Sequence, residues 1–300
     1  MNSGYGSSLT RVSIINDTTL KKEAISNYGK KRIKKEILFY KKLKESNINF
    51  PVPEFNQISE FKFNMEYLSD YITYQEYLNN GFKINKKVIF DHLKNLHANS
   101  IKVSEDEFKN NLQIETYGKV EERYSEIKDI IDKYNYIKIV NGIEILDFTN
   151  IINFIKNFIK SYEIPTNNHY SLIHGDLQLN NILINPNTND LKFIDPKGYF
   201  GNLDLFGMTE YDFAKFYFGL GGYSNFDMKE VNNLNIKDNE IIINIEAIEE
   251  IDLKQINLVN IFIISIWLGN AHCFKDNELK VVESFFYALY ISTKLIKRYK

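Results

Sequence analysis

The sequence has little of several features that would assign a protein to a class at once. A single cysteine, Cys273, among 300 residues excludes an intrachain disulfide framework and favours a reducing compartment. The net charge of −2 gives no argument for a nucleic-acid partner or a membrane surface. The first eight residues have no basic start and no apolar stretch, so we predict no signal peptide. We therefore expect a cytoplasmic protein.

Long apolar runs are also missing. The longest apolar stretch, residues 256–273, is interrupted by three asparagines and a histidine, which favours a buried helix over a membrane span. Hydrophobic residues make up 44% and charged residues 25%, as is usual in globular proteins. The length of 300 residues suits one large or two modest domains with a real core.

The most informative segment runs from residue 170 to residue 195. An apolar run leads into His-Gly-Asp, which ends at Asp176. Asn181 comes five residues later and begins a short β-rich run, and a returning strand after asparagine-rich turn residues ends at Asp195. We therefore predict a strand, a polar loop and a hairpin that bring these three side chains to one end of a small sheet.

Phosphoryl transfer from a nucleotide needs this set of side chains. One carboxylate must accept or orient the proton of an attacking hydroxyl, and we assign this role to Asp176. A carboxylate and an amide oxygen can hold Mg²⁺ against the phosphates, because hard cations take oxygen ligands, and we assign Asn181 and Asp195 to the metal. The alternative is a hairpin whose polar turn residues meet by chance.

The same residues carry a family resemblance. Asp-x₄-Asn followed by a later Asp matches the catalytic loop and metal-binding Asp of protein-kinase-like enzymes. The forms His-Gly-Asp-Leu-x-x-x-Asn-Ile-Leu and Ile-Asp-Pro resemble the aminoglycoside phosphotransferase and choline kinase branch. The resemblance implies an α+β, two-lobed fold with a small β-rich nucleotide-binding lobe (1–69) and a larger helical lobe (70–300). It also implies ATP, with GTP as the alternative, and Mg²⁺ as cofactors.

The first lobe is predicted to hold strands over residues 9–15 and 18–25 and a helix over 30–45. Within Leu-Lys-Lys on the second strand, Lys22 resembles the family's lysine that contacts the ATP phosphates. One alternative is that Lys21 has this role, and another is that both lysines are solvated. Glu36 lies on the edge of the helix's apolar stripe and should have a partner, because an unpaired buried charge is costly. The family pairs such a glutamate with the strand lysine, so we expect Glu36 to pair with Lys22.

Two other segments of this lobe are candidates for nucleotide binding. Gly4, Gly6 and Ser7 form a glycine-containing turn that can bring backbone N–H groups to phosphates, or they belong to a tail. A strand over residues 60–68 resembles the family's segment whose backbone hydrogen-bonds adenine. The resemblance therefore makes Glu66 and Leu68 the candidates for adenine contact. A plain edge strand is the alternative.

The second lobe is predicted to be mainly helical. We expect helices at 73–79, 86–101, 116–134, 147–162, 257–273 and 277–298, and a hairpin at 234–248. Pro196 stands where protein kinases continue Asp-Phe-Gly, and no Ala-Pro-Glu follows, which argues against a regulated protein kinase. Tyr-Asp-x-Ala-Lys resembles the family's helix whose Asp braces the catalytic loop, so Asp212 and His174 are interpreted as structural.

The expected partner is a small molecule with an acceptor hydroxyl. The segment after Asp195 and a late histidine resemble a subgroup linked to bacterial surface-polysaccharide and capsule metabolism, which favours a sugar or sugar-like alcohol. Choline, ethanolamine or an aminoglycoside are the alternatives, and a non-catalytic kinase-fold binding module is the alternative of another class. The oligomeric state stays open. The candidate substrate residues are Lys197, Tyr199, Asp204, Tyr223 and His272.

Overall fold

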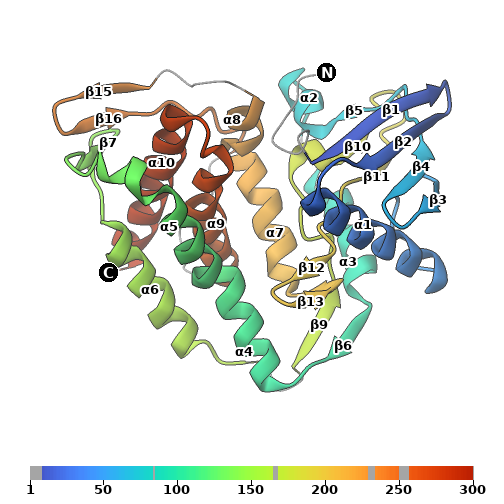
Figure 1. The fold of residues 1–300 in the computed structure, drawn as a ribbon, viewed down its shortest axis with the longest axis horizontal. Coiled ribbons are helices and arrows are strands. Elements are labelled where there is room, and N and C mark those ends of the chain that lie inside the picture. Colours follow the sequence, from blue (N-terminus) through green and yellow to red (C-terminus); the bar gives the residue numbers. More distant parts are fainter. Residues whose placement is uncertain (1–8, 84, 165–167, 229–233, 250–256, 300) are drawn as a thin grey trace. The chain divides into compact units, whose positions relative to one another are not determined.

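The structure is a computed structural model that describes residues 9–83, 85–164, 168–228, 234–249 and 257–299. The described residues form two compact units. The first unit comprises Met1–Val103 and His169–Phe216, and the second comprises Ser104–Asn168 and Tyr217–Lys300. The fold is α+β as predicted, with a β-rich N-terminal part and a helical C-terminal part (Figure 1). The lobe boundary between residues 69 and 70 stays a prediction.

The first unit begins with a four-stranded antiparallel sheet. Its strand order is β1-β2-β4-β3, with β1 (Thr10–Asn16), β2 (Thr19–Ala24), β3 (Phe55–Ser59) and β4 (Lys62–Glu66). The first two strands agree with prediction within one or two residues, whereas β3 was not expected. Lys22 lies opposite Val12 and Phe63 and is the buried residue of β2. Because side chains alternate along a strand, Lys21 points to the other face.

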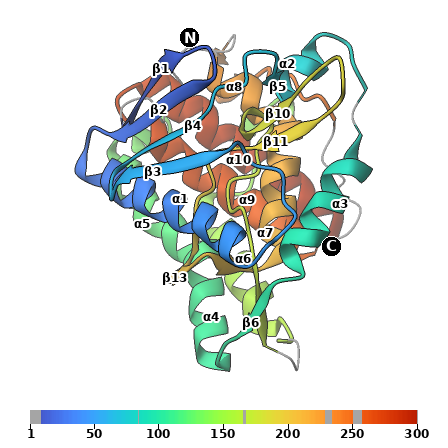
Figure 2. The ribbon, with the colours of Figure 1, turned by 90° about the vertical axis from the view of Figure 1, so that its right-hand side faces the viewer.

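Helix α1 (Asn27–Glu45) runs along this sheet (Figure 2). It starts three residues earlier than predicted, because Ser26 caps it by accepting a hydrogen bond from the Gly29 N–H at 2.9 Å. Its buried stripe contains the apolar residues that the 3- and 4-residue spacing predicts. Glu36 belongs to the same buried face, so the fold must provide this carboxylate with partners.

Short strands and three helices complete the first unit. The helices are α2 (Tyr74–Asn79), α3 (Lys86–His97) and α7 (Thr209–Phe218), the last of which continues beyond this unit. The strands are β5 (Ile72–Thr73), β6 (Ser100–Lys102), β9 (His169–Leu172), β10 (Ile182–Ile184), β11 (Leu191–Phe193), β12 (Tyr199–Phe200), β13 (Leu203–Asp204) and β14 (Phe206–Gly207). The helix predicted over 86–101 was too long, because Ser100–Lys102 pairs with β9 instead.

The second unit is mainly helical. Its helices are α4 (Glu105–Gln113), α5 (Lys119–Asp132), α6 (Phe148–Ser161), α8 (Ser224–Met228), α9 (Leu258–Asn270) and α10 (Glu278–Tyr299). A sheet of order β15-β16-β7-β8 contains β7 (Ile139–Val140), β8 (Ile143–Glu144), β15 (Asn235–Lys237) and β16 (Glu240–Ile242). The helix predicted over 116–134 is instead α5 preceded by a π-helix, Ile114–Gly118, and by α4. A capping box between Ser104 and Glu107 starts α4.

The apolar stretch near the C-terminus forms a buried helix, as predicted. Eleven residues of α9, among them the fully buried Trp267, are shielded from solvent. Such burial on all sides explains why this helix has few polar residues. Within the described ranges, no helix combines the length and the apolar character that a membrane span requires.

Candidate active site

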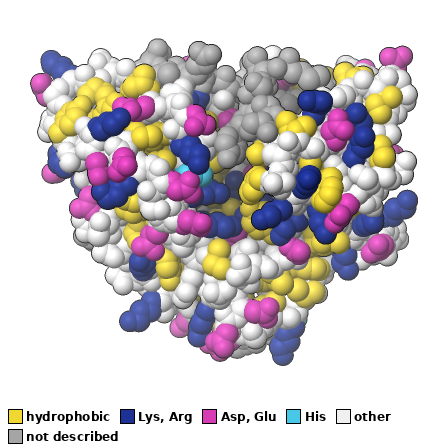
Figure 3. All heavy atoms as spheres, in the orientation of Figure 1, with side chains coloured by type: hydrophobic (Ala, Val, Ile, Leu, Met, Phe, Trp, Pro, Cys, Tyr) yellow, Lys and Arg dark blue, Asp and Glu magenta, His cyan; other side chains and the backbone are white. Residues whose placement is uncertain are grey.

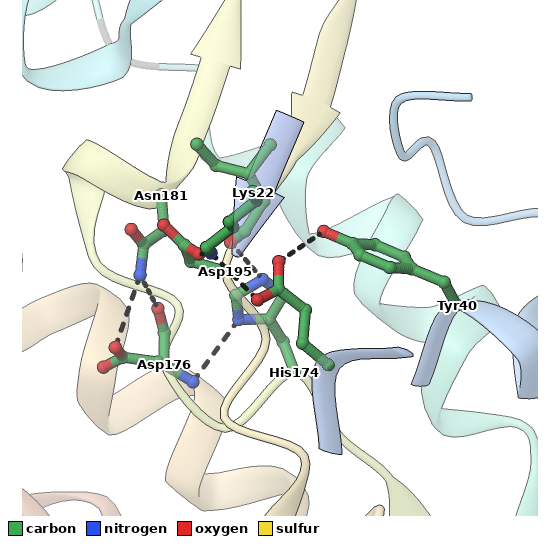
Figure 4. Close-up of polar contacts among 8 residues, drawn as sticks. Lys22, Tyr40, His174, Asp176, Asn181 and Asp195 are labelled. Atoms are coloured by element: carbon green, nitrogen blue, oxygen red, sulfur yellow. Dashed lines mark hydrogen bonds and ion pairs between the residues drawn. The ribbon is translucent and has the colours of Figure 1, made fainter. Parts of the chain in front are cut away.

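The predicted hairpin is present and brings the expected side chains together. Strands β10 and β11 pair antiparallel with Ile182 opposite Phe193, and the Ile194 N–H donates to the Asn181 carbonyl at 3.0 Å. This last hydrogen bond places Asn181 directly beside the chain that ends at Asp195 (Figure 4). A local turn and two short strands therefore assemble residues that are 14 positions apart in the sequence.

The side chain of Asn181 has a defined orientation. Its Nδ2 donates to the backbone carbonyl of Asp176 at 2.8 Å and lies 3.4 Å from that residue's Oδ2. The amide nitrogen therefore faces Asp176 and the amide oxygen faces away from it (Figure 4). A carbonyl oxygen held in this way is a suitable ligand for a hard cation.

Asp195 has an unusual backbone conformation. Its φ of 58° lies in the left-handed region, which costs a non-glycine residue about 1 kcal/mol or more. Its carboxylate contacts the Lys22 ammonium, and its side chain keeps 37% of its surface exposed. Strained backbone of this kind is common where a fold fixes the direction of a functional side chain.

Lys22 and Glu36 form the ion pair that the sequence predicts. The Lys22 Nζ lies 2.8 Å from Glu36 Oε2, and the Tyr40 hydroxyl donates to Glu36 Oε1 at 3.2 Å. Burial lowers the pKa of Lys22, and the Glu36 carboxylate opposes that shift. Burial and the same carboxylate raise the pKa of Tyr40 well above its usual value. Lys21 instead pairs with Glu23 at 3.2 Å.

Asp212 braces the loop that leads to Asp176. Its fully buried carboxylate accepts hydrogen bonds from the N–H groups of His174 at 3.0 Å and Gly175 at 2.7 Å. Its Oδ2 also lies 2.9 Å from Nε2 of His97, a residue of α3. These three contacts satisfy a buried charge and fix the backbone immediately before Asp176.

His174 is held as a neutral ring. Its Nε2 lies 2.9 Å from the Ile194 carbonyl, and its Nδ1 lies 3.3 Å from the Asp176 backbone N–H. The first contact requires a proton on Nε2 and the second requires Nδ1 to be an acceptor, which together define one neutral tautomer. Burial lowers the pKa of His174, in agreement with this assignment.

Asp176 lies beside cations that are not among the predicted site residues. Lys215 Nζ is 2.9 Å from its Oδ1. Burial would raise the pKa of Asp176, but the positive charges of Lys215 and Arg32 outweigh burial and hold that pKa below its usual value. A local signal for Lys215 existed, because it follows Asp212 by three residues and so shares its helix face.

The other predicted nucleotide-binding residues are those near the N-terminus and those at the end of β4. Gly4, Gly6 and Ser7 lie outside the described residues. Glu66 ends β4, and its N–H donates to the Glu54 carbonyl at 2.8 Å. Leu68 follows the strand, and its carbonyl accepts a hydrogen bond from the Tyr71 N–H at 3.2 Å. Their contact with adenine stays a prediction.

Three of the substrate candidates lie in the first unit. Lys197 is buried, its Nζ is 3.2 Å from the Tyr211 hydroxyl, and it lies 4.4 Å from the centre of the Tyr199 ring. Lys35 of α1 lies over the same Tyr199 ring at 4.6 Å and forms an ion pair with Asp204. The β12–β13 hairpin is thus fastened to α1. The roles of these residues toward a substrate stay predictions.

The remaining two candidates lie in the second unit. The ring of Tyr223 stacks on Phe218 with 4.2 Å between centroids and belongs to the aromatic core around Trp267. His272 Nε2 lies 2.9 Å from Glu126 Oε2. These contacts explain how each side chain is held in this unit, and their part in substrate binding stays a prediction.

The predicted metal ligands fit Mg²⁺. The donor set is one carboxylate, on Asp195, and one amide oxygen, on Asn181, whose nitrogen is already used by Asp176. Mg²⁺ is typically bound by one or two protein oxygens, with substrate phosphates and water filling the other positions. These two residues would therefore hold the ion only together with a nucleotide.

Comparison with known proteins identifies the fold. No family model and no curated protein matches the sequence. A choline/ethanolamine kinase family protein from Mesorhizobium loti matches over 97% of this chain and 88% of its own, with 9% identity and a TM-score of 0.54. The GDP and kanamycin complex of APH(2")-IIia matches over 96% and 90%, with 14% identity and a TM-score of 0.54. Against the streptomycin–ATP complex of APH(2")-IIa, the chain spans 66% of that protein's length at a TM-score of 0.41.

The chain therefore has the protein-kinase-like fold of the aminoglycoside phosphotransferases and the choline/ethanolamine kinases. This confirms the fold that the resemblance in the sequence implies. At these identities the likeness establishes the fold, and the activity must be argued from the site. The surface-polysaccharide subgroup stays a prediction.

Proposed function

We propose that the protein transfers the terminal phosphoryl group of ATP to a hydroxyl of a small molecule. The observation that carries this proposal is the position of the Lys22 ammonium, which contacts both Glu36 and Asp195. This ammonium joins the predicted phosphate-binding strand to the predicted metal-binding hairpin. A set of polar turn residues that met by chance would have no reason to include a buried lysine from another sheet.

Each residue has a role that its geometry supports. Asp176 accepts the proton of the acceptor hydroxyl while that oxygen bonds to the γ-phosphorus and the bond to the ADP oxygen breaks. Lys22, fixed by Glu36, orients the phosphates. Bound Mg²⁺, held by Asn181 and Asp195, would neutralise phosphate charge. Most of the rate enhancement should come from positioning and electrostatics, because proton transfer contributes about 10²–10⁴-fold.

The acceptor is the finer part of the proposal. The sequence around Asp195 favours a sugar or sugar-like alcohol of surface-polysaccharide metabolism. Choline, ethanolamine and aminoglycosides are the alternatives, and a kanamycin complex and a choline/ethanolamine kinase family protein are among the solved neighbours. GTP is the alternative nucleotide, since one neighbour holds GDP.

On the face drawn in Figure 3, described basic and acidic side chains are interspersed. This distribution of charge does not resemble the basic stripe of a nucleic-acid site.

The test is nucleotide turnover by the purified full chain with Mg²⁺. ATP and GTP are each combined with sugars, sugar alcohols, choline, ethanolamine and aminoglycosides, and Asp176→Asn is the control. We expect one acceptor to stimulate turnover, and the substitution to lower kcat by about 10²–10⁴-fold while nucleotide affinity stays nearly unchanged. Absence of Mg-nucleotide binding by the wild-type chain would overturn the proposal and favour a non-catalytic module.

A further inference from the structure

One turn of α7 holds both the backbone and the side chain of the catalytic loop. Asp212 accepts the N–H groups of His174 and Gly175, and Lys215, three residues later, contacts the carboxylate of Asp176. Residues three apart lie on the same side of a helix, so a rigid element fixes the two contacts relative to one another. The contact is largely shielded from solvent, because the side chains of Lys215 and Asp176 are only 17% and 18% exposed.

The two oxygens of Asp176 are not equivalent. Oδ1 lies 2.9 Å from the Lys215 ammonium. Oδ2 lies 3.4 Å from Asn181 Nδ2, which is a long contact and leaves lone pairs of this oxygen for another donor. The contact with Lys215 would limit the rotation of the carboxylate and leave Oδ2 as the oxygen that can accept from an acceptor hydroxyl. A free carboxylate would sample other rotations and would be less well oriented for proton transfer.

The same contact changes the charge that an acceptor meets. Lys215 neutralises Asp176 at close range, and Arg32 of α1 adds further positive charge near this carboxylate. An acceptor that carries ammonium groups close to its reacting hydroxyl would be repelled by Lys215 and would gain little from an already paired aspartate. A neutral or anionic acceptor meets no such penalty.

We propose that Lys215 is a positioning residue for Asp176 and that its charge selects against cationic acceptors. The acceptor class is then a neutral or anionic polyhydroxyl compound, rather than an aminoglycoside or a choline-like amine. This inference rests on the proposed phosphotransferase function and specifies the acceptor of that same site.

The variants that test this inference are Lys215→Gln, Lys215→Arg and a matched surface control, Lys34→Gln. Lys34 lies on α1 and pairs with Glu60 in an exposed position, so its substitution removes the same charge away from Asp176. The acceptors are neutral monosaccharides and sugar alcohols, carboxylated monosaccharides, kanamycin and choline. Each is assayed at saturating Mg-ATP with the full chain.

The kinetic result expected is a change in kcat and in selectivity. The wild-type chain should use a neutral or carboxylated sugar with kcat/KM about tenfold or more above that for kanamycin or choline, the size of effect that one close like-charge contact gives. Lys215→Gln should lower kcat by about tenfold and leave the KM for ATP unchanged. It should also reduce the ratio of kcat/KM for the sugar to kcat/KM for kanamycin or choline. Lys215→Arg should restore most of kcat, and Lys34→Gln should resemble the wild type. Wild-type preference for kanamycin or choline, or an unchanged ratio in Lys215→Gln, overturns the inference.

A second measurement separates this inference from the proposed function. In the protein without nucleotide, the amide NMR resonances of Gly175 and Asp176 should move in Lys215→Gln and stay in place in Lys34→Gln. Unmoved resonances overturn the positioning role whatever the enzyme assay shows. If the wild-type chain fails to bind Mg-ATP while these resonances do move, the proposed function fails, the acceptor class falls with it, and the positioning of Asp176 by Lys215 stands.

Discussion

The Nζ of Lys22 lies 2.8 Å from Oε2 of Glu36, and both side chains are buried. The two residues come from β2 and α1, and the same ammonium reaches Asp195, which is 173 positions away in the sequence. Three elements of the first unit therefore meet at one positive charge (Figure 4). A change at this position should affect both the stability of the unit and its predicted nucleotide site.

Replacing Lys22 by methionine should destabilise the protein. The change leaves Glu36 as a buried carboxylate with only Tyr40 as a hydrogen-bond partner among the contacts described above, and breaking a buried ion pair typically costs ~3–5 kcal/mol. We expect urea unfolding to show a loss of that order. The double variant Lys22→Met/Glu36→Leu should recover part of it, and Lys21→Met, which removes a more exposed charge, should change little. A double variant no more stable than Lys22→Met would contradict this account.

Replacing Asp212 by asparagine should loosen the loop that leads to Asp176. Asparagine has the same shape, but one of its two terminal groups is a donor and would face a backbone N–H or the His97 ring. We expect a loss of about 2 kcal/mol in the free energy of unfolding and faster hydrogen exchange at the amides of His174 and Gly175. Asp204→Asn changes an exposed carboxylate and is the control. Unchanged exchange at the two amides would show that Asp212 is not the brace.

Most of the site was predictable because its residues belong to local patterns. Asp176, Asn181 and Asp195 lie in one short segment, a loop followed by a hairpin, whose turn residues can be recognised in the sequence. The helical stripe indicated that Glu36 needs a partner, and the family resemblance named Lys22 as that partner. Tyr40 follows Glu36 by four residues on the same helix, so the hydrogen bond from its hydroxyl to Glu36 was also within reach of local reasoning.

The parts that were missed depend on contacts between distant segments. The helix predicted over 86–101 ends at His97 because Ser100–Lys102 finds a partner strand at 169–172, which no local propensity indicates. The contact between His97 and Asp212 spans 115 positions. Lys215 could be placed on the helix face of Asp212, but only the fold shows that this face meets Asp176.

Replacing Gly198 by alanine should disturb the contact between the chain that follows Asp195 and α1. Gly198 has a φ of +69°, and an added Cβ would lie 2.9 Å from both the Cβ and the carbonyl oxygen of Lys35. Gly81→Ala is the matched control, because Gly81 also has a positive φ of +85° but has nothing within 4 Å of the added atom. We expect the control to cost about 1 kcal/mol and Gly198→Ala at least twice that. Equal losses in thermal and urea unfolding would contradict the close packing on α1.

The neutral state of His174 predicts an acid-sensitive stability. Burial lowers the pKa of His174 in the fold, whereas the unfolded chain has the usual value of about 6.5. At a pH between the folded and the unfolded pKa, the His174 ring binds a proton in the unfolded chain but not in the fold. The stability gained by keeping this ring neutral is therefore fully present above pH 6.5. It is lost as the pH falls, by at most ~1.4 kcal/mol of unfolding free energy per pH unit. The free energy of unfolding should therefore depend more steeply on pH between 7.5 and 5.5 in the wild type than in His174→Gln. Equal slopes would show that the fold does not lower the pKa of His174.

Replacing Asp195 by alanine should remove the dependence of nucleotide binding on Mg²⁺. Asp195 provides the carboxylate of the predicted metal site and also contacts Lys22, so the variant loses a cation ligand and leaves the ammonium with Glu36 alone. Ligands that bind only the folded state raise the melting temperature, so the wild type should be stabilised by ATP with Mg²⁺ and much less by ATP with EDTA. In Asp195→Ala the two shifts should be equal. Asp190→Ala, an exposed carboxylate that accepts from Thr188 Oγ1 at 2.8 Å in the same hairpin, should behave as the wild type. If Asp195→Ala retained a larger shift with Mg²⁺ than with EDTA, the metal would have to be held by other residues.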